Sequence, residues 1–302
     1  MSEEMRSKMA RPNRYQIMDL YKSEIEFVLQ ELNKNIFSVA DINSVLFSNQ
    51  YKWKLPASTT TEEFLEFLVE RRKILRQVAI ILGGREIIRY VFNNSQLDHA
   101  EFAVSLFSNL YLSHYSAVTL HDLTDEIVKS IYVNREQSEK KGAPSVVLLQ
   151  QNIDQAFLKP MRQTNNFFDF ENRRIYVLNG RYTNQLGIIK KNGLQVTDLE
   201  RTLIDIAVRP DYAGGVNEVL NIYRRAKGLI SVNKMRMYIQ KLKYIYPYHQ
   251  AIGFYLELAG YNDTALKLMS NIPVEHDFYL TYNIIEKAYS SRWRLYYPQN
   301  LS

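Results

Sequence analysis

A glycine pair between two β-branched runs constrains the front of this chain more than any other feature. The runs are Leu75–Leu82 and Glu86–Phe92, and Gly83-Gly84-Arg85 separates them. Glycine adopts the positive φ angles of a tight turn without strain, so this pattern predicts a β-hairpin. Three short segments with helical apolar spacing precede it, near residues 24–32, 39–46 and 62–72. Three helices followed by a hairpin is the order of a winged helix-turn-helix, which we predict for residues 1–95.

Local signals indicate where these helices begin. Ser23 and Ser38 each stand just before an apolar periodic segment, so we expect both to be N-caps. We interpret residues 1–20 as a mobile arm. The third predicted helix follows four hydroxyl side chains, those of Ser58, Thr59, Thr60 and Thr61.

The same front segment contains the residues that we predict to bind DNA. In a winged helix the third helix enters the major groove, so its N-terminal hydroxyls should point outward to phosphates or base edges. Lys52 and Lys54 precede that helix, and Arg85 lies at the hairpin tip. Glu62, Glu63, Glu66 and Glu70 make the helix acid-rich, so some of them must face away, paired to Arg71, Arg72 or Lys73. The alternative is a winged helix that serves only as a protein-interaction module.

Composition favours a folded protein with an acidic partner. The chain has 302 residues, 46% of them hydrophobic and 23% charged, with a net charge of +6. It has no cysteine, which excludes disulfides and thiolate metal sites and fits a reducing cytoplasm. The N-terminal residues do not resemble a secretory signal, and the longest apolar run near the front, Val78–Leu82, is too short to span a bilayer. We therefore expect a cytoplasmic protein without a membrane partner.

The strongest single helix signal lies between Val196 and Gly215. Thr197 followed by Glu200 predicts a capping box, and Pro210 and the glycines Gly214 and Gly215 end the helix. Its apolar residues recur at helical spacing, which indicates a central packing element. Arg201, Asp205 and Arg209 follow one another at intervals of four residues on a different face. We interpret them as a structural salt-bridge ladder, with a direct catalytic role as the alternative.

The remaining pattern predicts an α+β fold. Helices are expected near 98–106, 113–120 and 149–158, and strands near 127–134, 166–170, 174–178, 186–190 and 194–196. Further helices follow near 216–227, 232–243 and 248–259. The predicted architecture is thus an N-terminal winged helix-turn-helix and, in residues 96–302, a mixed α/β domain that ends in a helical, basic part.

That basic part contains the largest charge asymmetry in the sequence. Between Val219 and Leu256 there is no Asp or Glu, whereas seven Lys and Arg residues are interleaved with tyrosines. We predict a second nucleic-acid surface at Arg224, Arg225 and Lys227, with the tyrosines stacking on exposed bases. An acidic protein is another candidate partner. The remaining alternative is a solvated face that acids from elsewhere neutralise.

Signatures of catalysis are largely missing. The sequence contains no Walker A, GxGxxG or G-x-S-x-G motif, and its five histidines lack metal-site spacing. We interpret His114 as a packed or capping residue. Asp169 and Glu171, with Arg173 behind them, leave a metal-dependent nuclease as an alternative, although the constellation is incomplete. We therefore predict no catalytic residues, no cofactor and no metal, and a protein that is not an enzyme.

Several segments together resemble the AbiEi family of bacterial antitoxins, from type IV toxin–antitoxin pairs of abortive-infection phage defence. The resemblance lies in VTDLERTLIDIAVRPDYAGG (196–215), YLSHYSAVTLHDL (111–123), IYVNREQ (131–137), YPYHQAIGFYLELAGY (246–261) and WRLYYP (293–298). With the winged-helix segment it covers most of the chain.

The resemblance implies a function for each part of the chain. The N-terminal domain would bind inverted repeats of its own operator as a dimer and repress transcription. The remainder would be the antitoxin domain, which counteracts an AbiEii-type nucleotidyltransferase toxin without a stable complex. The resemblance also implies a bacterial cytoplasm as the location.

Overall fold

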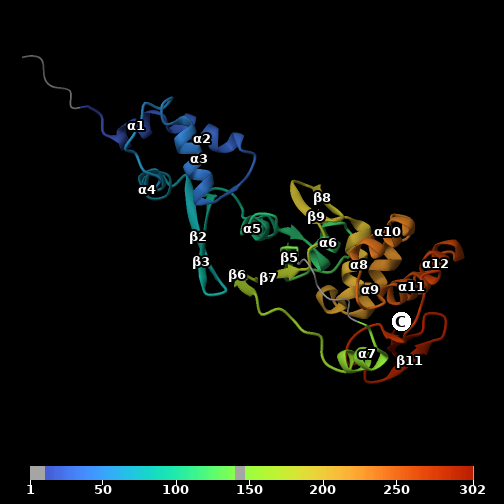
Figure 1. Cartoon of the computed structure of the whole chain (residues 1–302). Helices are drawn as coiled ribbons and strands as arrows, with labels where there is room; N and C mark the ends of the chain where they lie inside the picture. The colour runs from blue at the N-terminus through green and yellow to red at the C-terminus, as the bar shows by residue number, and fades with distance from the viewer. Residues whose placement is uncertain (1–10, 140–146, 302) are drawn as a thin grey trace, which may run out of the picture. The chain divides into compact units, whose positions relative to one another are not determined.

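The computed structural model describes residues 11–139 and 147–301 (Figure 1). The chain divides into two compact units, Met1–Leu106 and Phe107–Ser302. The first unit thus continues beyond the predicted boundary at residue 95 and includes helix α5 (His99–Ser105). Arg89 explains this extension, because its guanidinium donates to the carbonyl oxygens of Ser105 and Leu106 at 2.6–2.9 Å.

The first unit has the element order of a winged helix. A three-stranded antiparallel sheet has the strand order β1-β3-β2, and its long hairpin is the predicted one. The elements before α5 are α1 (Arg14–Leu20), α2 (Lys22–Glu31), β1 (Ile36–Phe37), α3 (Val39–Asn49), α4 (Thr61–Glu66), the π-helical turn η2 (Phe67–Arg71), β2 (Leu75–Leu82) and β3 (Arg85–Phe92).

Three local expectations for this unit need correction. Residues 14–20 form helix α1 rather than an arm, and Asn13 caps it in a capping box with Gln16. The first ten residues of the expected arm lie outside the described part. Ser23 is not an N-cap, because α2 already begins at Lys22. Ser38 does cap α3, as predicted, in a capping box with Asp41.

The core of the first unit explains how α4, the helix predicted as the third, is held. Trp53 is fully buried, and its ring lies 5.8 Å from that of Phe64 on α4. Helices α1, α2 and α3 contribute Met18, Ile25, Leu29, Ile42 and Leu46 to the same apolar cluster, and the turn η2 and the sheet contribute further members. The segment that carries Lys52 and Lys54 is therefore anchored by the aromatic side chain between them.

The second unit contains the predicted mixed sheet. Its six strands have the order β6-β7-β5-β4-β9-β8, in which the β5–β7 and β4–β9 pairs are parallel and the others antiparallel. The strands are β4 (Tyr111–Leu112), β5 (Ser130–Glu136), β6 (Phe167–Phe170), β7 (Arg173–Gly180), β8 (Ile188–Lys191) and β9 (Leu194–Thr197). Helices α6 (His114–Leu120) and α7 (Gln150–Phe157) belong to the same part of the chain.

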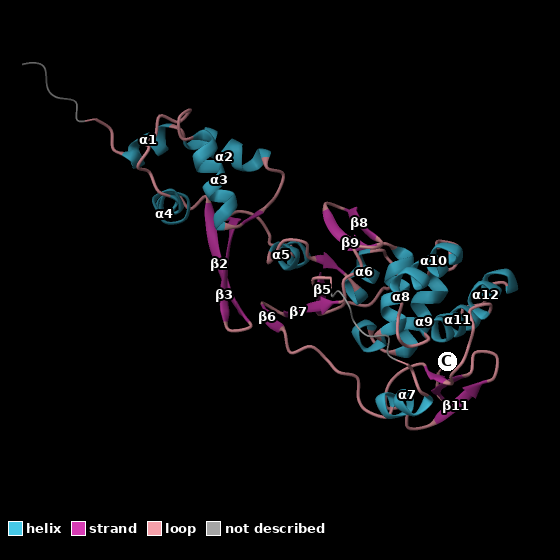
Figure 2. Ribbon diagram, viewed as in Figure 1, coloured by secondary structure: helices cyan, strands magenta, loops and turns pink. Residues whose placement is uncertain are grey.

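Helix α8 (Leu199–Val208) is the central packing element that its sequence predicts. Every residue from Glu200 to Ala207 is buried, and α6, α9, α10 and α11 pack around it (Figures 1 and 2). Its cap differs from the prediction by one residue. Asp198 accepts from the Arg201 N–H, while the Thr197 hydroxyl, at the end of β9, bonds to Thr202.

Helices and a small sheet complete the second unit. The helical elements are η3 (Pro210–Ala213), α9 (Val216–Arg225), α10 (Val232–Leu242), α11 (Tyr248–Leu258) and α12 (Asp263–Ser270), and the sheet has the order β10-β12-β11. Its strands are β10 (Phe278–Tyr279), β11 (Lys287–Ser290) and β12 (Leu295–Pro298). The sequence did not predict α12 or this sheet. Within the described residues, no helix has the length and apolar composition that crossing a bilayer requires.

Candidate functional site

The predicted DNA-binding residues of the first unit fall into two groups. Lys54 and Arg85 are exposed, and no carboxylate of the described residues forms an ion pair with either. Lys52 is also exposed, but its ammonium lies 2.5 Å from a Glu24 carboxylate oxygen. Lys54 and Arg85 can therefore meet a phosphate directly, whereas Lys52 must first leave its partner.

The four hydroxyls before α4 do not all point outward. Ser58 is exposed, and Thr60 caps the helix by accepting from the Glu63 N–H at 3.3 Å. Thr61 donates to the side-chain oxygen of Asn43 on α3 at 2.6 Å. Thr59 is buried, and its hydroxyl has no partner among the described residues. The outward orientation is therefore wrong for Thr59 and Thr61, because both lie against the body of the unit.

Partners on α1 and η2 hold two of the acids on the acid-rich predicted third helix, which is α4 with η2. Glu63 pairs with Arg14, and Glu66 accepts from Tyr15 at 2.6 Å and from Arg71 at 2.9 Å. The hydrogen bond from the Thr60 N–H and the pair with Arg14 both lower the pKa of Glu63. Only the Arg71 pairing was expected from the sequence, since α1 itself was not predicted. Glu62 and Glu70 remain exposed on this helix.

The basic segment of the second unit, residues 219–256, does not display its tyrosines. Tyr223 is fully buried and donates to the Leu203 carbonyl at 3.0 Å, and Tyr238 is buried and donates to Asp198 at 2.7 Å. Tyr248 is buried as well, while Tyr244 and Tyr246 pack partly buried against the core. These rings therefore stabilise the helical core, and the prediction that they stack on exposed bases is wrong.

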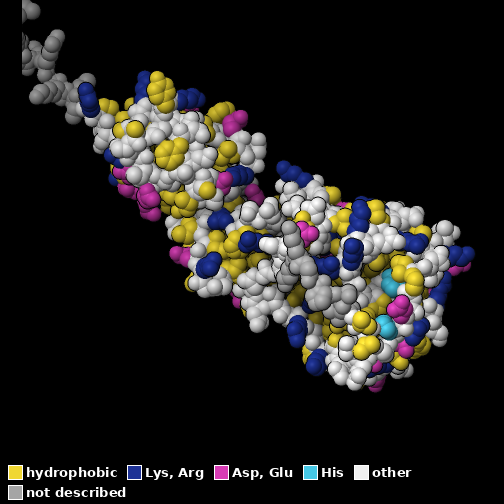
Figure 3. Space-filling view, viewed as in Figure 1, with side chains coloured by type: hydrophobic (Ala, Val, Ile, Leu, Met, Phe, Trp, Pro, Cys, Tyr) yellow, Lys and Arg dark blue, Asp and Glu magenta, His cyan; other side chains and the backbone are white. Residues whose placement is uncertain are grey.

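Acids from elsewhere in the unit meet several charges of this segment. Arg225 lies 2.5 Å from Asp125, and Lys234 lies 2.8 Å from Glu200 and 3.1 Å from Asp198. Arg224 donates to Asn221 at 3.2 Å, and Lys227 is exposed. In the space-filling view, Lys and Arg side chains are scattered over the visible face of the second unit (Figure 3). Arg225 and Lys234 are therefore neutralised by acids from elsewhere in the unit, as the solvated-face alternative expects.

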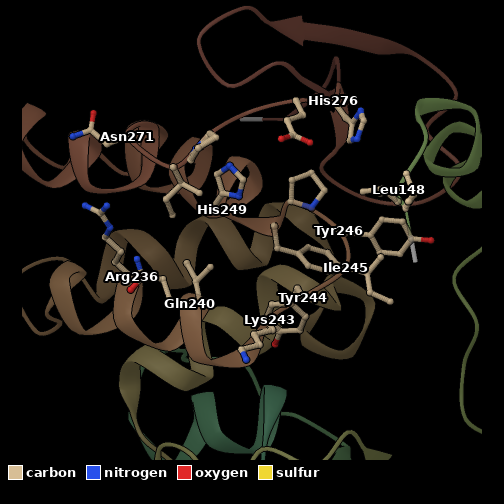
Figure 4. A pocket seen from close by; sticks show the side chains of 17 residues that line it. Leu148, Arg236, Gln240, Lys243, Tyr244, Ile245, Tyr246, His249, Asn271 and His276 are labelled. Carbon is tan, nitrogen blue, oxygen red and sulfur yellow. The ribbon is translucent and has the colours of Figure 1, made fainter. Parts of the chain in front are cut away.

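Part of the basic segment lines a cavity of about 590 Å³. Arg236 and Gln240 on α10, Lys243 at its end and His249 on α11 contribute to the wall (Figure 4). Burial lowers the pKa of His249 to about 4, so its imidazole is neutral at pH 7. The Nε2 atom of His249 is buried without a hydrogen-bond partner in the described structure.

A second cavity, of about 400 Å³, lies beside α8 and holds the Arg201, Asp205 and Arg209 side chains. The Arg201 Nε donates to Asp205 at 2.8 Å, which confirms the first step of the predicted ladder. Arg209 instead donates to the carbonyl oxygen of Arg162 at 2.9 Å. The ladder therefore stops after one pair, and its third member, Arg209, lines the cavity.

His114 lines the same cavity. It is buried, as expected, but its φ of 50° lies in the left-handed region that non-glycine residues rarely adopt. Its Nδ1 lies 3.0 Å from the Ser113 hydroxyl, although adjacency in sequence gave no reason to expect that bond. Burial lowers its pKa to about 4, so this imidazole too is neutral at pH 7.

The acids of the nuclease alternative, Asp169 and Glu171, line one open pocket of about 280 Å³ together with Arg173. Asp169 on β6 is held by Arg174 through bonds of 2.7 and 3.0 Å, and Arg173 donates to the Val128 carbonyl. Glu171 lies in the turn between the two strands with a φ of 50°. In residues 11–139 and 147–301, no group of three or more His, Asp or Glu side chains is arranged to hold a metal ion.

The comparisons with known proteins bear on the fold alone. No protein-family model and no curated protein sequence matches the chain. Among solved structures, the chain is similar to the crystal structure of the RV2827C protein from Mycobacterium tuberculosis, with 11% identity and a TM-score of 0.58. The similarity covers 92% of this chain and 91% of that one, so it extends over both units.

Proposed function

We propose that this chain is a DNA-binding antitoxin of the AbiEi type, which binds its own operator and represses transcription. The observation that carries the proposal is the winged-helix topology of the first unit, with an exposed hairpin tip at Arg85. In such domains the third helix and the hairpin approach the duplex together. A dimer would then match an inverted-repeat operator with one copy per half-site.

The charges of the first unit support DNA binding at α4 and the hairpin. Two side chains can contact a phosphate directly, and a third can do so only after it leaves its carboxylate partner. Lys54 and Arg85 hold unpaired charges on the segment before α4 and on the hairpin tip. Lys52 would exchange Glu24 for a phosphate, which lowers its net contribution. The Thr60 hydroxyl already caps α4, so the N-terminal N–H groups of the helix, rather than the hydroxyls of Thr59 and Thr61, would meet a phosphate.

The second unit would relieve the toxicity of a partner nucleotidyltransferase of the AbiEii type, without a stable complex. The segments that resemble AbiEi antitoxins coincide with core elements, namely β4–α6, β5, α8, α11 and β12. A resemblance in buried elements supports a common fold more directly than a common chemistry. The antitoxin activity therefore rests on the resemblance, whereas the DNA-binding activity also has the winged-helix topology behind it.

The test combines a gel shift with a toxicity assay. The full chain should shift DNA from its own promoter in a salt-sensitive complex and shift scrambled DNA of the same length more weakly. Co-expression should rescue growth in cells that express the nucleotidyltransferase encoded next to it. Toxin capture without any DNA complex would instead support a pure protein-interaction module. Metal-dependent cleavage of the DNA would support a nuclease.

A further inference from the structure

The α8 cavity is assembled from distant parts of the second unit. Its walls include Asn134 on β5 and Arg162 in the segment after α7. Arg181, Arg209 and Tyr244 also contribute, from the residues that follow β7, α8 and α10 respectively. Its volume of about 400 Å³ falls in the range of about 300–1,000 Å³ that is typical of small-molecule sites.

Three of its arginines form no close ion pair in the described part of the chain, although the charge of Arg209 acts on the nearby Asp211 carboxylate. Burial raises the pKa of Asp211, and the charge of Arg209 opposes that rise. Within the described residues, no carboxylate forms an ion pair with Arg162, Arg181 or Arg209. Arg181 donates through Nη1 to the Lys243 carbonyl at 3.0 Å, and Arg209 donates through Nη1 to the Arg162 carbonyl at 2.9 Å. These bonds fix the guanidinium groups and leave their other N–H donors free to bind a ligand. Like charges that face one cavity repel each other until an anion joins them.

The inner wall is held by hydrogen bonds and contributes no further net charge. Arg201 is buried; it pairs with Asp205 and also donates to the Leu186 carbonyl at 2.9 Å. Asp205 is therefore already neutralised by Arg201 and does not cancel the charge of the outer arginines. Asn134 is held between the Tyr111 hydroxyl at 2.5 Å and the Gly180 N–H at 2.9 Å.

His114 supplies the second observation that indicates a ligand. It is more than nine-tenths buried and lines the cavity, and its Nδ1 is taken by Ser113, whereas Nε2 has no partner among the described residues. A non-glycine residue at a φ of 50° is strained, and such strain is concentrated at functional sites. The Tyr212 ring holds the imidazole edge-to-face at 5.5 Å.

We propose that the α8 cavity binds a phosphate-bearing group of mononucleotide size, held by Arg162, Arg181 and Arg209. Guanidinium groups match the geometry of phosphate oxygens and bind them through paired N–H donors. Tyr212 and Tyr244 form the aromatic part of the wall, against which a sugar or base can pack. The source of the group is either a free nucleotide or the phosphorylated end of a nucleic-acid strand. The proposal concerns the second unit and does not depend on operator binding by the first.

Calorimetric titration of the full chain tests this proposal. The probes are adenosine monophosphate, cytidine monophosphate, inorganic phosphate, adenosine, and a short single-stranded RNA with and without a terminal phosphate. We expect a phosphorylated probe to bind with a Kd below about 1 mM and adenosine not to bind. Binding of the monophosphates identifies a free nucleotide. Binding of the phosphorylated RNA alone identifies a strand end.

The variants locate the binding. Arg181→Gln combined with Arg209→Gln should weaken binding by about tenfold or more, because two guanidinium groups that can each donate two hydrogen bonds to a phosphate are lost. Arg162→Gln is a second variant that preserves the fold, since only the Arg162 backbone carbonyl is used in a bond. Arg236→Gln removes the same charge from the other cavity and should leave the Kd within about twofold. The proposal is overturned if no phosphorylated probe binds, or if Arg236→Gln weakens binding as much as the cavity variants do.

Discussion

The basic segment and the α8 cavity both concentrate positive charge in the second unit, but they do so in opposite ways. The seven cations of the basic segment are neighbours in sequence, and they are distributed over α9, α10 and the residues that follow each helix. Two of them, Arg225 and Lys234, meet carboxylates. The cavity arginines are far apart in sequence and converge in space. Density along the chain is therefore a poor guide to density on a surface.

The two regions also differ in how deeply their ion pairs are buried. Arg201 and Asp205 lie in the wall of the cavity with side chains that are 6% and 9% exposed. Arg225 and Asp125 lie in solvent, at 45% and 84%. Loss of one partner should therefore have very different consequences in the two places, because a buried charge cannot turn to water for compensation.

The largest expected effect comes from this contrast. Asp205→Ala should destabilise the fold by about 3–5 kcal/mol, since it leaves the Arg201 guanidinium buried and uncompensated. Asp125→Ala, the matched exposed variant, should leave the melting temperature nearly unchanged. Thermal denaturation followed by circular dichroism measures both. The double variant Arg201→Met, Asp205→Leu should recover most of the loss, because replacing both charges avoids the uncompensated one.

Two outcomes would contradict this contrast between the buried and the exposed ion pair. If Asp205→Ala keeps the parent melting temperature, the pair does not stabilise the fold. If that stable variant also loses toxin relief, the Arg201–Asp205–Arg209 stripe has a functional role.

The next effect concerns pH, because each cavity holds a buried neutral histidine. Burial depresses the pKa of His114 and of His249 from 6.5 to about 4. Between these two values the unfolded chain binds more protons than the folded one, so stability falls as pH drops from about 6.5 toward 4. The full loss is roughly 3 kcal/mol for each histidine.

Urea denaturation at a series of pH values measures this slope. His249→Gln should flatten it, because glutamine does not titrate, while His276→Gln serves as the control on the edge of the same cavity. An identical slope in His249→Gln and in the parent would show that His249 does not carry the effect.

The smallest effect should come from the basic segment itself. We expect simultaneous reversal of Arg224, Arg225 and Lys227 to glutamate to change operator affinity by less than about threefold. The reason is that dissolved salt screens the interactions of exposed charges. A gel shift and the growth-rescue assay measure the two activities separately. Loss of operator affinity with rescue intact would restore the predicted DNA surface. Loss of rescue with the operator still bound would assign the segment to an RNA or an acidic partner.

Sequence reasoning succeeded where the determining residues are local. Gly83 and Gly84 fix the hairpin, and Ser38 fixes the start of α3, because the turn and the capping box each involve only a few consecutive residues. Helix α1 was missed although Asn13 and Gln16 form the same kind of box. The three-residue spacing between Asn13 and Gln16 could have predicted the start of α1. Thr197 was chosen over Asp198 as the α8 cap, because the sequence does not show that Thr197 ends a strand.

The rest could not be derived locally. β10 pairs in parallel with β12 across residues that are distant in sequence, and both strands are short. The burial of Tyr223 and Tyr238 depends on helices that fold against them, which the interleaved pattern of tyrosines and cations does not reveal. The α8 cavity is the extreme case. Arg162, Arg181 and Arg209 lie in three separate segments, which follow α7, β7 and α8, and no spacing in the sequence links them.

The most direct test of operator binding is the salt dependence of the complex between the full chain and its own promoter DNA. Each phosphate contact contributes about 0.9 to the slope of log K against log salt. The triple variant Lys52→Ala, Lys54→Ala, Arg85→Ala should therefore bind more weakly and lower the slope by about two to three. Removing three exposed lysines of the second unit, Lys159, Lys190 and Lys267, changes the net charge equally and should leave the slope unchanged. A triple variant of the first unit that keeps the parent affinity and slope would contradict this account.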